Sequence, residues 1–444
     1  MNIVIAGAGE VGSHLAKLLS NEEQDIILLD ENADKLASLD ANYNLMTVVG
    51  NPTNFGSLRE AHAGDADLFI AVTPYETDNV VACSMAKSLG ASTTVARITS
   101  YDYMAPGNSR FVKQMGVDRV IYPEYLAAQE IITALNHSWV RHWFELHNGE
   151  IILVGVKIHD NALIADMHLK DFANTNHHFH VSAIKRNHET IIPRGDDIIK
   201  SGDILYITTT RDHVNDLIEL TGKVAQRIRR VLVMGGSKIA ARLAVMAGEN
   251  FDFRIVENDI ERCRKLPTIC ADCEIIHGDA RDPELLSEIG IEETDAFIAL
   301  TDSSESNILA CLTAKELGVK KTIAEVENLQ FISQAESLNI GTVINKKLLA
   351  SSSIFQMLLD SDSSTAKCLA LADAEVAELE VRPGSKITSA PVKDLRLSRD
   401  MTLAGLIRDG KGMLIGGMTH IQAGDHVLVF CLSGSIHKVE KLFN

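Results

Sequence analysis

Short apolar runs alternate with amphipathic stretches over residues 2–135, and the same alternation returns over residues 230–350. Runs such as residues 68–72 are continuously apolar, as expected for parallel strands that are covered on both faces. Between the runs, apolar residues recur at the three-and-four spacing of a helix, as Leu15 and Leu19 do. Each region therefore predicts the order β-α-β-α-β-α-β-α-β and a doubly wound, Rossmann-like parallel sheet.

The two regions can be aligned with each other over more than 90 residues, with order and spacing preserved. The matching segments, first copy before second, are 3–7 with 231–235, 25–30 with 253–257, 49–51 with 277–279, 67–73 with 295–301 and 77–79 with 305–307. A repeat of this length is stronger evidence than any single motif, so we interpret the chain as an internal duplication.

A strand-rich module follows each copy, over about residues 150–210 and 376–433. Each module closes with a Gly-Asp turn before an apolar strand, at Gly202 and at Gly424. Because modules of roughly 80 residues bury little apolar surface alone, we expect them to pair with each other or with another subunit. The fold class expected is α/β, with two Rossmann-like sheets each followed by a small α+β domain.

Three further segments stand out between these regions. The basic residues 227–230 link the two halves. Residues 351–353, which are three serines, and residues 360–364 are rich in small and polar residues, so we expect looser segments there.

The composition of the chain indicates which classes of binding partner to expect. The 444 residues carry a formal net charge of -18, and aromatic residues make up only 5%. An acidic surface repels nucleic acid and anionic lipid, so we expect no nucleic-acid partner. No apolar run is long enough to cross a bilayer, no signal peptide is expected, and seven cysteines without framework spacing fit a reducing cytoplasm.

The first copy carries a Gly-x-Gly-x-x-Gly loop, residues 7–12, between a predicted strand and a predicted helix. Gly7 permits the tight turn, Gly9 lets the backbone approach a pyrophosphate, and Gly12 allows close packing of helix on strand. Asp30 ends the second strand, where a carboxylate accepts both ribose hydroxyls and repels a 2′-phosphate. This combination predicts a nucleotide site that favours NAD over NADP.

The second copy departs from this pattern, because Ser237 replaces the middle glycine and Ala240 the last. The side chain of Ser237 reduces the space in which the backbone can approach a phosphate. Its hydroxyl can nevertheless donate a hydrogen bond, and Lys238 adds positive charge. Glu257 keeps the ribose-facing carboxylate. Whether this second site binds a nucleotide, and whether it prefers a different one, stays open at this point.

Polar residues end the other strands of both predicted sheets, at the carboxyl edge where open α/β folds bind ligands. They are Asn51, Thr73 and Arg97 in the first copy, and Asp279, Thr301 and Glu325 in the second. Arg97 either contacts phosphate or adenine or forms a surface ion pair. Glu325 at the matching position indicates that the two pockets differ in charge.

Two clusters have the look of metal ligands. Cys270 and Cys273 form a Cys-x-x-Cys pair near Cys263 and His277, but the first copy has no cysteine there, so we favour ordinary thiols. Residues 177–180 hold three histidines, for which an exposed loop is the simpler interpretation. We therefore expect no metal site.

No catalytic set emerges from the sequence. A dehydrogenase positions a proton donor against the nicotinamide, and neither copy has a Tyr-x-x-x-Lys at helical spacing. The chain repeats a nucleotide domain in place of a substrate domain, which favours sensing over turnover. An NAD-dependent oxidoreductase with a duplicated Rossmann core is the alternative, and a free-standing nucleotide sensor with another partner is the third possibility.

Taken together, these residues resemble the Trk potassium-uptake regulators, a family built from tandem RCK (or KTN) domains, along the whole chain. The resemblance implies RCK N-terminal domains at residues 1–134 and 228–350, and RCK C-terminal domains at residues 135–222 and 364–444. By the same resemblance the nucleotide contacts are Gly7, Ala8, Gly9, Glu10, Val11, Gly12, Asp30, Asn51, Thr73 and Arg97, then Gly235, Gly236, Ser237, Lys238, Ile239, Glu257, Asp279 and Thr301.

The resemblance also implies a function. The chain would be a non-enzymatic regulatory subunit that binds NAD+ or NADH, and ATP or ADP as further candidates. It would assemble as a ring, expected as a tetramer, on the membrane-embedded potassium-conducting subunit. Its location would be cytoplasmic and peripheral on the inner face of the membrane, where ligand exchange would bend the ring and gate the pore.

Overall fold

The computed structural model describes residues 1–20, 24–187, 189–359, 369–371, 374–432, 439 and 442–443. These residues form two compact units, which are described separately. Unit 1 comprises Met1–Leu126 and Lys346–Asp362, and unit 2 comprises Ala127–Asn345 and Ser363–Asn444. No described helix is long and apolar enough to cross a membrane.

Unit 1 is built on a six-stranded sheet in the order β3-β2-β1-β4-β5-β6, and every pairing is parallel. Its strands are β1 (Asn2–Ala6), β2 (Asp25–Asp30), β3 (Met46–Val49), β4 (Leu68–Ala71), β5 (Thr93–Arg97) and β6 (Arg119–Ile121). The crossover helices are α1 (Glu10–Ser20), α2 (Ala33–Asp40), α3 (Phe55–Glu60), α4 (Glu76–Leu89) and α5 (Ser109–Gln114). The buried strand β4 is apolar throughout, as the sequence pattern predicts for a strand covered on both faces.

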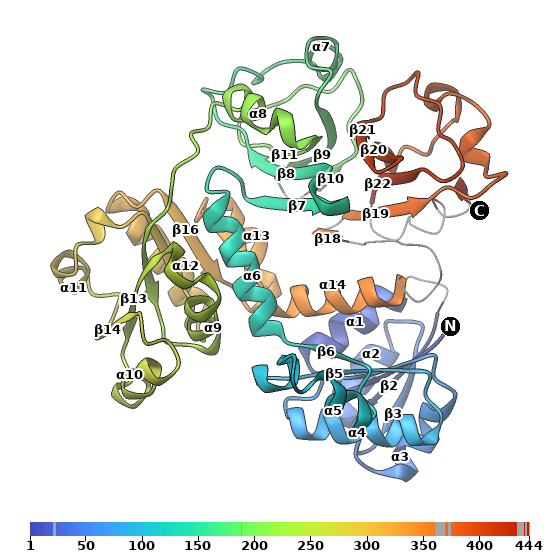
Figure 1. Ribbon diagram of the computed structural model, residues 1–444, viewed down its shortest axis with the longest axis vertical. Helices are drawn as coiled ribbons and strands as arrows, with labels where there is room; N and C mark the ends of the chain where they lie inside the picture. The colour runs from blue at the N-terminus through green and yellow to red at the C-terminus, as the bar shows by residue number, and fades with distance from the viewer. Residues whose placement is uncertain are drawn as a thin grey trace. The chain divides into compact units, whose positions relative to one another are not determined.

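A helix from much later in the chain completes unit 1 (Figure 1). This helix, α14 (Lys346–Leu359), packs against α1 and β6. Residues 351–353 lie within it and Ser351 is fully buried, so the expectation of a looser segment there is wrong. The run of serines is tolerated because Ser351 Oγ donates back to the Lys347 carbonyl, 2.9 Å away, and so satisfies its own hydrogen bond inside the helix. Residues 360–364 lie outside the described residues.

Unit 2 repeats the same sheet, in the order β14-β13-β12-β15-β16-β17. Its strands are β12 (Arg230–Met234), β13 (Asp252–Glu257), β14 (Glu274–His277), β15 (Ala296–Ala299), β16 (Lys321–Glu325) and β17 (Thr342–Ile344). Its helices are α9 (Lys238–Ala247), α10 (Ile260–Lys265), α11 (Pro283–Glu288), α12 (Ser304–Glu316) and α13 (Leu329–Ser337). Each copy thus has a sixth strand, β6 or β17, beyond the five expected; with three residues each, these strands are too short to show in the apolar pattern.

Two antiparallel sheets complete unit 2, in the orders β10-β9-β11-β8-β7 and β18-β19-β22-β20-β21. The first contains β7 (His142–Leu146), β8 (Ile151–Lys157), β9 (His180–Arg186), β10 (Glu189–Ile191) and β11 (Ile204–Thr209), with helices α7 (Leu169–Thr175) and α8 (Val214–Leu220). The second contains β18 (Leu369–Leu371), β19 (Ala374–Glu380), β20 (Met401–Arg408), β21 (Lys411–Leu414) and β22 (His426–Leu432). Helix α6 (Pro123–Asn136) leads from unit 1 into unit 2.

The two antiparallel sheets share one apolar core. Leu153 and Tyr206 of the first sheet lie in the same buried cluster as Val376, Leu428 and Phe430 of the second. The rings of Tyr206 and Phe430 have their centroids 5.9 Å apart. The two modules therefore cover each other within one chain, which confirms one of the two pairings expected from their small size.

In both modules the aspartate of the Gly-Asp turn binds an arginine side chain. Asp203 and Asp425 are buried and accept paired hydrogen bonds of 2.7–2.8 Å from Arg186 and Arg408, respectively. Each carboxylate also accepts a backbone N–H from the turn itself. A buried bidentate arginine–carboxylate pair fixes the geometry of the turn before the last long strand.

Candidate nucleotide sites

The first glycine loop is built as its motif predicts. Gly7 has φ +111°, and a Cβ there would lie 3.0 Å from the Thr73 backbone nitrogen. A Cβ on Gly12 would collide with the carbonyl oxygen of Gly7. Gly9, by contrast, has no atom within 4 Å of an added Cβ, so its backbone faces open space at the start of α1. Two glycines are needed by the fold, and the middle one leaves room for a ligand.

Asp30 is held directly beside this loop. Its Oδ2 accepts a hydrogen bond of 2.6 Å from the Ala8 N–H, and its Oδ1 accepts one of 2.8 Å from the Asn32 N–H. Each carboxylate oxygen keeps a second lone pair. The carboxylate is therefore oriented at the loop and still able to accept hydroxyl donors.

A buried amide joins the ends of β4 and β5. Asn79 Oδ1 accepts from the Thr73 N–H and from Thr73 Oγ1, both at 2.8 Å, and its Nδ2 donates to the carbonyls of Thr73 and Arg97. The sequence comparison showed Asn79 as a repeated residue but gave it no role. Its structural role is to hold two candidate contacts, Thr73 and Arg97, at one sheet edge.

Asn51 and Arg97 differ in how their polar atoms are satisfied. The Asn51 amide donates to Glu31 Oε1 at 2.7 Å and accepts from Thr53, so it orders the loop after β3. The Arg97 Nε is buried and makes no hydrogen bond within the described structure. Asn51 therefore has its partners, whereas this buried nitrogen of Arg97 has none in the described structure, which is an exception to the usual pairing of buried donors.

Helix α14 brings two residues to the same loop. Lys347 forms an ion pair with Glu10, which is the first residue of α1, and the Ser351 hydroxyl lies 3.5 Å from the Val11 carbonyl oxygen. Burial lowers the pKa of Lys347 below its ordinary value. The sequence analysis missed Lys347, since nothing in the local pattern relates residue 347 to a loop at residue 10.

The second loop repeats the backbone arrangement of the first. Gly235 has φ +97°, and the Gly236 N–H donates to Glu257 Oε2 at 2.6 Å, as Ala8 does to Asp30. Glu257 Oε1 accepts from the Asp259 N–H at 2.8 Å. Ser237, in place of the middle glycine, caps α9 by accepting from the Ala240 N–H at 3.4 Å. The serine thus has a structural use that the motif comparison did not predict.

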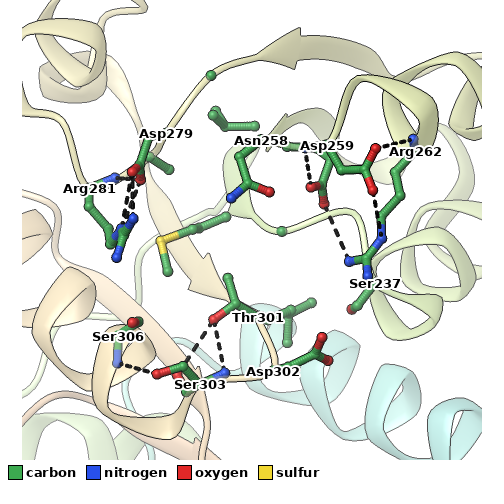
Figure 2. Close-up of a pocket in the computed structure, with 17 residues that line it drawn as sticks. Ser237, Asn258, Asp259, Arg262, Asp279, Arg281, Thr301, Asp302, Ser303 and Ser306 are labelled. Atoms are coloured by element: carbon green, nitrogen blue, oxygen red, sulfur yellow. Dashed lines mark hydrogen bonds and ion pairs between the residues drawn. The ribbon is translucent and has the colours of Figure 1, made fainter.

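A pocket of about 360 Å³ opens between this loop and the carboxyl edge of the sheet. Figure 2 shows Asp279 and Arg281 on one side of it and Asp259 and Arg262 on the other. Arg281 binds Asp279 through two nitrogens, at 2.7 and 2.9 Å, and Arg262 lies 4.0 Å from Glu257. The Asp279 pairing lowers the pKa of that carboxyl. Both guanidinium groups are about half exposed and lie close to the space that a ligand would fill.

Thr301 lines this pocket, and a buried asparagine binds it as Asn79 binds Thr73. Its hydroxyl donates to Asn307 Oδ1 at 2.6 Å, and Asn307 Nδ2 donates to the carbonyls of Thr301 and Glu325. Asn307 is completely buried. A buried asparagine therefore joins the ends of adjacent strands in both copies.

The predicted residues of the second copy separate into two groups. Gly235, Ser237, Glu257, Asp279 and Thr301 line the pocket, whereas Gly236, Lys238 and Ile239 do not belong to its lining. The sequence analysis missed the remaining polar lining residues, which are Asn258, Asp259, Arg262, Arg281, Asp302, Ser303 and Ser306. Several directly follow a predicted residue in sequence, so extending each motif by two positions would have found Asn258, Asp259, Arg281, Asp302 and Ser303.

The clusters that resembled metal ligands have other surroundings. Cys270 Sγ contacts the Leu266 carbonyl at 3.2 Å, and burial raises the pKa of Cys273 to about 12. His178 stacks on His213 with centroids 3.7 Å apart, and His180 Nε2 lies 3.1 Å from the Thr402 hydroxyl. Within the described part of the chain, no three His, Cys, Asp or Glu side chains are grouped as metal ligands would be.

Comparison with known proteins places the chain among potassium-uptake proteins. The TrkA-N domain family matches residues 3–123 and 231–346, and the TrkA-C domain family matches residues 153–222 and 376–444. The Trk system potassium uptake protein TrkA of Vibrio alginolyticus is 29% identical over 451 residues, covering 100% of this chain and 98% of the relative. A TrkA homolog 2 of Methanosarcina mazei is 30% identical over 458 residues, covering all of both chains.

Solved structures share the fold at low sequence identity. The GsuK RCK domain superposes with a TM-score of 0.60 at 15% identity, covering 100% of this chain and 94% of that one. A GsuK channel bound to NAD gives a TM-score of 0.61 at 14% identity, covering 100% and 78%. The architecture described above, paired parallel and antiparallel sheets, is thus that of RCK domains.

Proposed function

The chain belongs to the TrkA family, and from that membership we propose that it is the nucleotide-binding regulatory subunit of a potassium uptake transporter. The observation that carries the proposal is shared by both halves. In each half, a carboxylate beside a strand-to-helix turn accepts a hydrogen bond of 2.6 Å from a backbone N–H of the loop. The pairs are Asp30 with Ala8 and Glu257 with Gly236. This is the arrangement that places a ribose next to a pyrophosphate in Rossmann folds.

We propose NAD+ or NADH as the ligand of the first site. The start of α1 and the open backbone at Gly9 would receive the pyrophosphate, since helix N-termini offer N–H donors and positive potential. Asp30 would accept the ribose hydroxyls, and its negative charge disfavours a 2′-phosphate. Arg97, at the end of β5, would contact phosphate or adenine, and Thr73 and Asn51 would complete the edge.

We propose that the second site binds a nucleotide of different charge, with ATP or ADP as the candidates. Its pocket carries Arg262 and Arg281, whose side chains are about half exposed. Guanidinium groups flanking a cavity favour ligands with concentrated phosphate charge. A GsuK channel bound to ADP shares the fold at 13% identity and a TM-score of 0.52. The two arginines support the assignment of a phosphate-rich nucleotide to this pocket, and the neighbour supports ADP as a ligand of the fold.

We propose that the protein acts by switching and does not turn over its ligand. The pocket of the second half is lined by carboxylates, arginines, hydroxyls and an amide, and the chain repeats a nucleotide domain in place of a substrate domain. A ligand that binds one arrangement of linked domains better than another supplies the coupling energy, typically ~1–3 kcal/mol. An NAD-dependent oxidoreductase is the competing function.

The assembly proposed is a ring, a tetramer of tandem chains, docked on the cytoplasmic face of the membrane-embedded potassium-conducting subunit. We place two tandem RCK units in each chain, with N-terminal domains at 1–134 and 228–350 and C-terminal domains at 135–222 and 364–444. Two binding sites per chain would then act on one ring.

Calorimetric titration of the full chain with NADH and then with ADP tests this proposal. We expect one NADH site per chain, abolished by Gly9→Val, and an ADP site that survives this change and is lost with Arg262→Gln/Arg281→Gln. Absence of nucleotide binding would overturn the proposal. Sustained NADH oxidation on addition of a carbonyl substrate would favour the oxidoreductase instead.

A further inference from the structure

Six basic side chains gather in unit 2 where the first antiparallel sheet meets the second parallel sheet. They are Arg141, Lys157, Lys185, Lys223, Lys315 and Lys321. We call this group the cationic cluster. Its density is unexpected in a chain whose net charge is -18, and the nucleotide pockets do not include any of its members.

Three members converge on a single residue, Asn339. Arg141 Nη2 donates to Asn339 Oδ1 at 2.8 Å, and Lys157 Nζ donates to the same oxygen at 3.4 Å. Lys315, in the last turn of α12, donates to the Asn339 carbonyl. Asn339 has φ +56°, a left-handed conformation that turns the chain after α13. The side chain at the centre of these three cations is therefore a neutral amide, whereas a carboxylate at this position would balance their positive charge.

The acidic partners of the cluster are few and already engaged. Glu336 is bound by Lys185 at 2.7 Å, with both side chains largely buried. Glu130 lies near Lys321; burial raises the pKa of the Glu130 carboxyl to about 7 and lowers the pKa of Lys321 to about 7. Lys321 itself donates to the Val140 carbonyl and to Thr342 Oγ1, both at 3.1 Å.

The cations act unfavourably on one another. Burial, and then the charges of Arg141 and Lys315, lower the pKa of Lys157. Burial, Arg141, Lys157 and Lys315 lower the pKa of Lys223 to about 8. Like charges at close range cost free energy unless an anion neutralises them. Clusters of this kind are a common way of recognising phosphate groups.

We propose that an oxyanion of the phosphate class binds among Arg141, Lys157, Lys223 and Lys315. These side chains lie on different elements: Arg141 precedes β7, Lys157 ends β8, Lys223 follows α8 and Lys315 lies on α12. An anion held by all four therefore bridges the first antiparallel sheet and the second parallel sheet. The site is separate from both glycine loops, and so the proposal stands whether or not those loops bind nucleotide.

A binding experiment with inorganic phosphate and pyrophosphate tests the site in the full chain. Titrations are run at constant ionic strength in chloride buffer with saturating NADH, which displaces phosphate from the first loop. A parallel series in the Arg262→Gln/Arg281→Gln background accounts for phosphate held at the second pocket. The variant is Lys157→Gln/Lys315→Gln, which removes both charges and keeps a polar side chain only one heavy atom shorter. The matched control is Lys113→Gln/Lys411→Gln, which removes the same charge from two exposed positions.

We expect one saturable site per chain in the wild type and the control, and affinity reduced at least tenfold in the cluster variant. Thermal unfolding supplies a second reading: phosphate should raise the midpoint of the wild type more than that of the cluster variant. If the double variant fails to fold, Lys157→Gln alone is expected to show the same loss to a smaller degree. Equal affinity in variant and control, or no saturable site in the wild type, would show that the cations only clamp Asn339, and would overturn the proposal.

Discussion

Lys347, at the beginning of α14, forms an ion pair with Glu10 inside the first glycine loop. The two residues are far apart in sequence, yet both belong to unit 1. Glu10 stands at the N-terminus of α1, where a negative charge competes with an incoming phosphate for the same helix end. Lys347 offsets that charge, so a residue of the second half contributes to the electrostatics of the first site.

We predict that Glu10→Gln strengthens NADH binding at the first site and that Lys347→Gln weakens it, each by roughly three- to tenfold, or about 1 kcal/mol. The double variant should bind nearly as the wild type does, because both charges are gone. Calorimetry of the four proteins gives the coupling. Unchanged NADH affinity in both single variants would show that the pair has no influence on ligand binding.

Gly12 and Gly9 of the first loop should respond differently to a side chain. Gly12→Ala pushes a methyl group into the Gly7 carbonyl and to within 3.3 Å of Val72, so we expect a loss of about 1–3 kcal/mol in unfolding free energy. Gly9→Val meets no neighbour at its Cβ and should change stability little while blocking NADH. Urea denaturation beside calorimetry separates the two. If Gly9→Val binds NADH normally, the pyrophosphate lies elsewhere.

Asp30→Ala should weaken NADH binding by more than tenfold and leave the fold intact. The substitution removes the proposed ribose acceptor and also the acceptor for the Ala8 N–H, which orients the loop. Asp30→Asn keeps one oxygen acceptor and should lose less. Circular dichroism checks folding, and NADH fluorescence gives the dissociation constants. An unchanged constant in Asp30→Ala would contradict our placement of the ribose.

Asn307→Ala should destabilise the second parallel sheet by about 2 kcal/mol or more. The substitution leaves the Thr301 N–H and two strand-end carbonyls without their partner in a fully buried position. Thermal unfolding measures the loss, and Asn42→Ala, which removes an exposed amide, is the matched control. A change as small as that of the control would mean that water replaces the amide at low cost.

Stability should fall with pH below neutrality in part because of His142. Burial, together with Arg141, Lys185 and Lys321, lowers the pKa of His142 to about 4 from 6.5, while Glu336 opposes the shift. The unfolded chain then binds more protons than the folded one between those values, so this contribution is present above pH 6.5 and is lost as the pH falls toward 4.

His142→Phe tests this assignment, since a phenyl ring keeps the stacking on Phe144 and Tyr206. We expect the pH dependence of the unfolding free energy between pH 6.5 and 4 to become shallower by about one proton. Urea unfolding at a series of pH values measures it, and the exposed His177→Gln should leave the slope unchanged. An unchanged slope in His142→Phe would assign the acid sensitivity to other groups.

Much of the fold was predictable because it depends on local periodicity that occurs twice. The strand at residues 68–72 and its partner near 295–301 show the pattern of a buried parallel strand, and the glycine loops follow from spacing alone. Features that depend on distant partners were not predictable. The burial of the α14 serines comes from packing on α1, which the local sequence does not show, so these serines were interpreted as a loose segment. Arg262 could not be assigned to the site either, because only folding places it beside Glu257.

The shared core of the two antiparallel sheets has a consequence for how the halves can evolve. Tyr206 and Phe430 meet as the contact residues of a dimer would, but here one polypeptide supplies both sides. A covalent tether keeps such partners at high effective concentration and fixes which half pairs with which. In a true homodimer, every substitution appears on both sides; here Gly9 and Ser237, or Arg97 and Glu325, are free to differ. Duplication thus lets the two halves of an otherwise symmetric pair acquire different residues at matching positions.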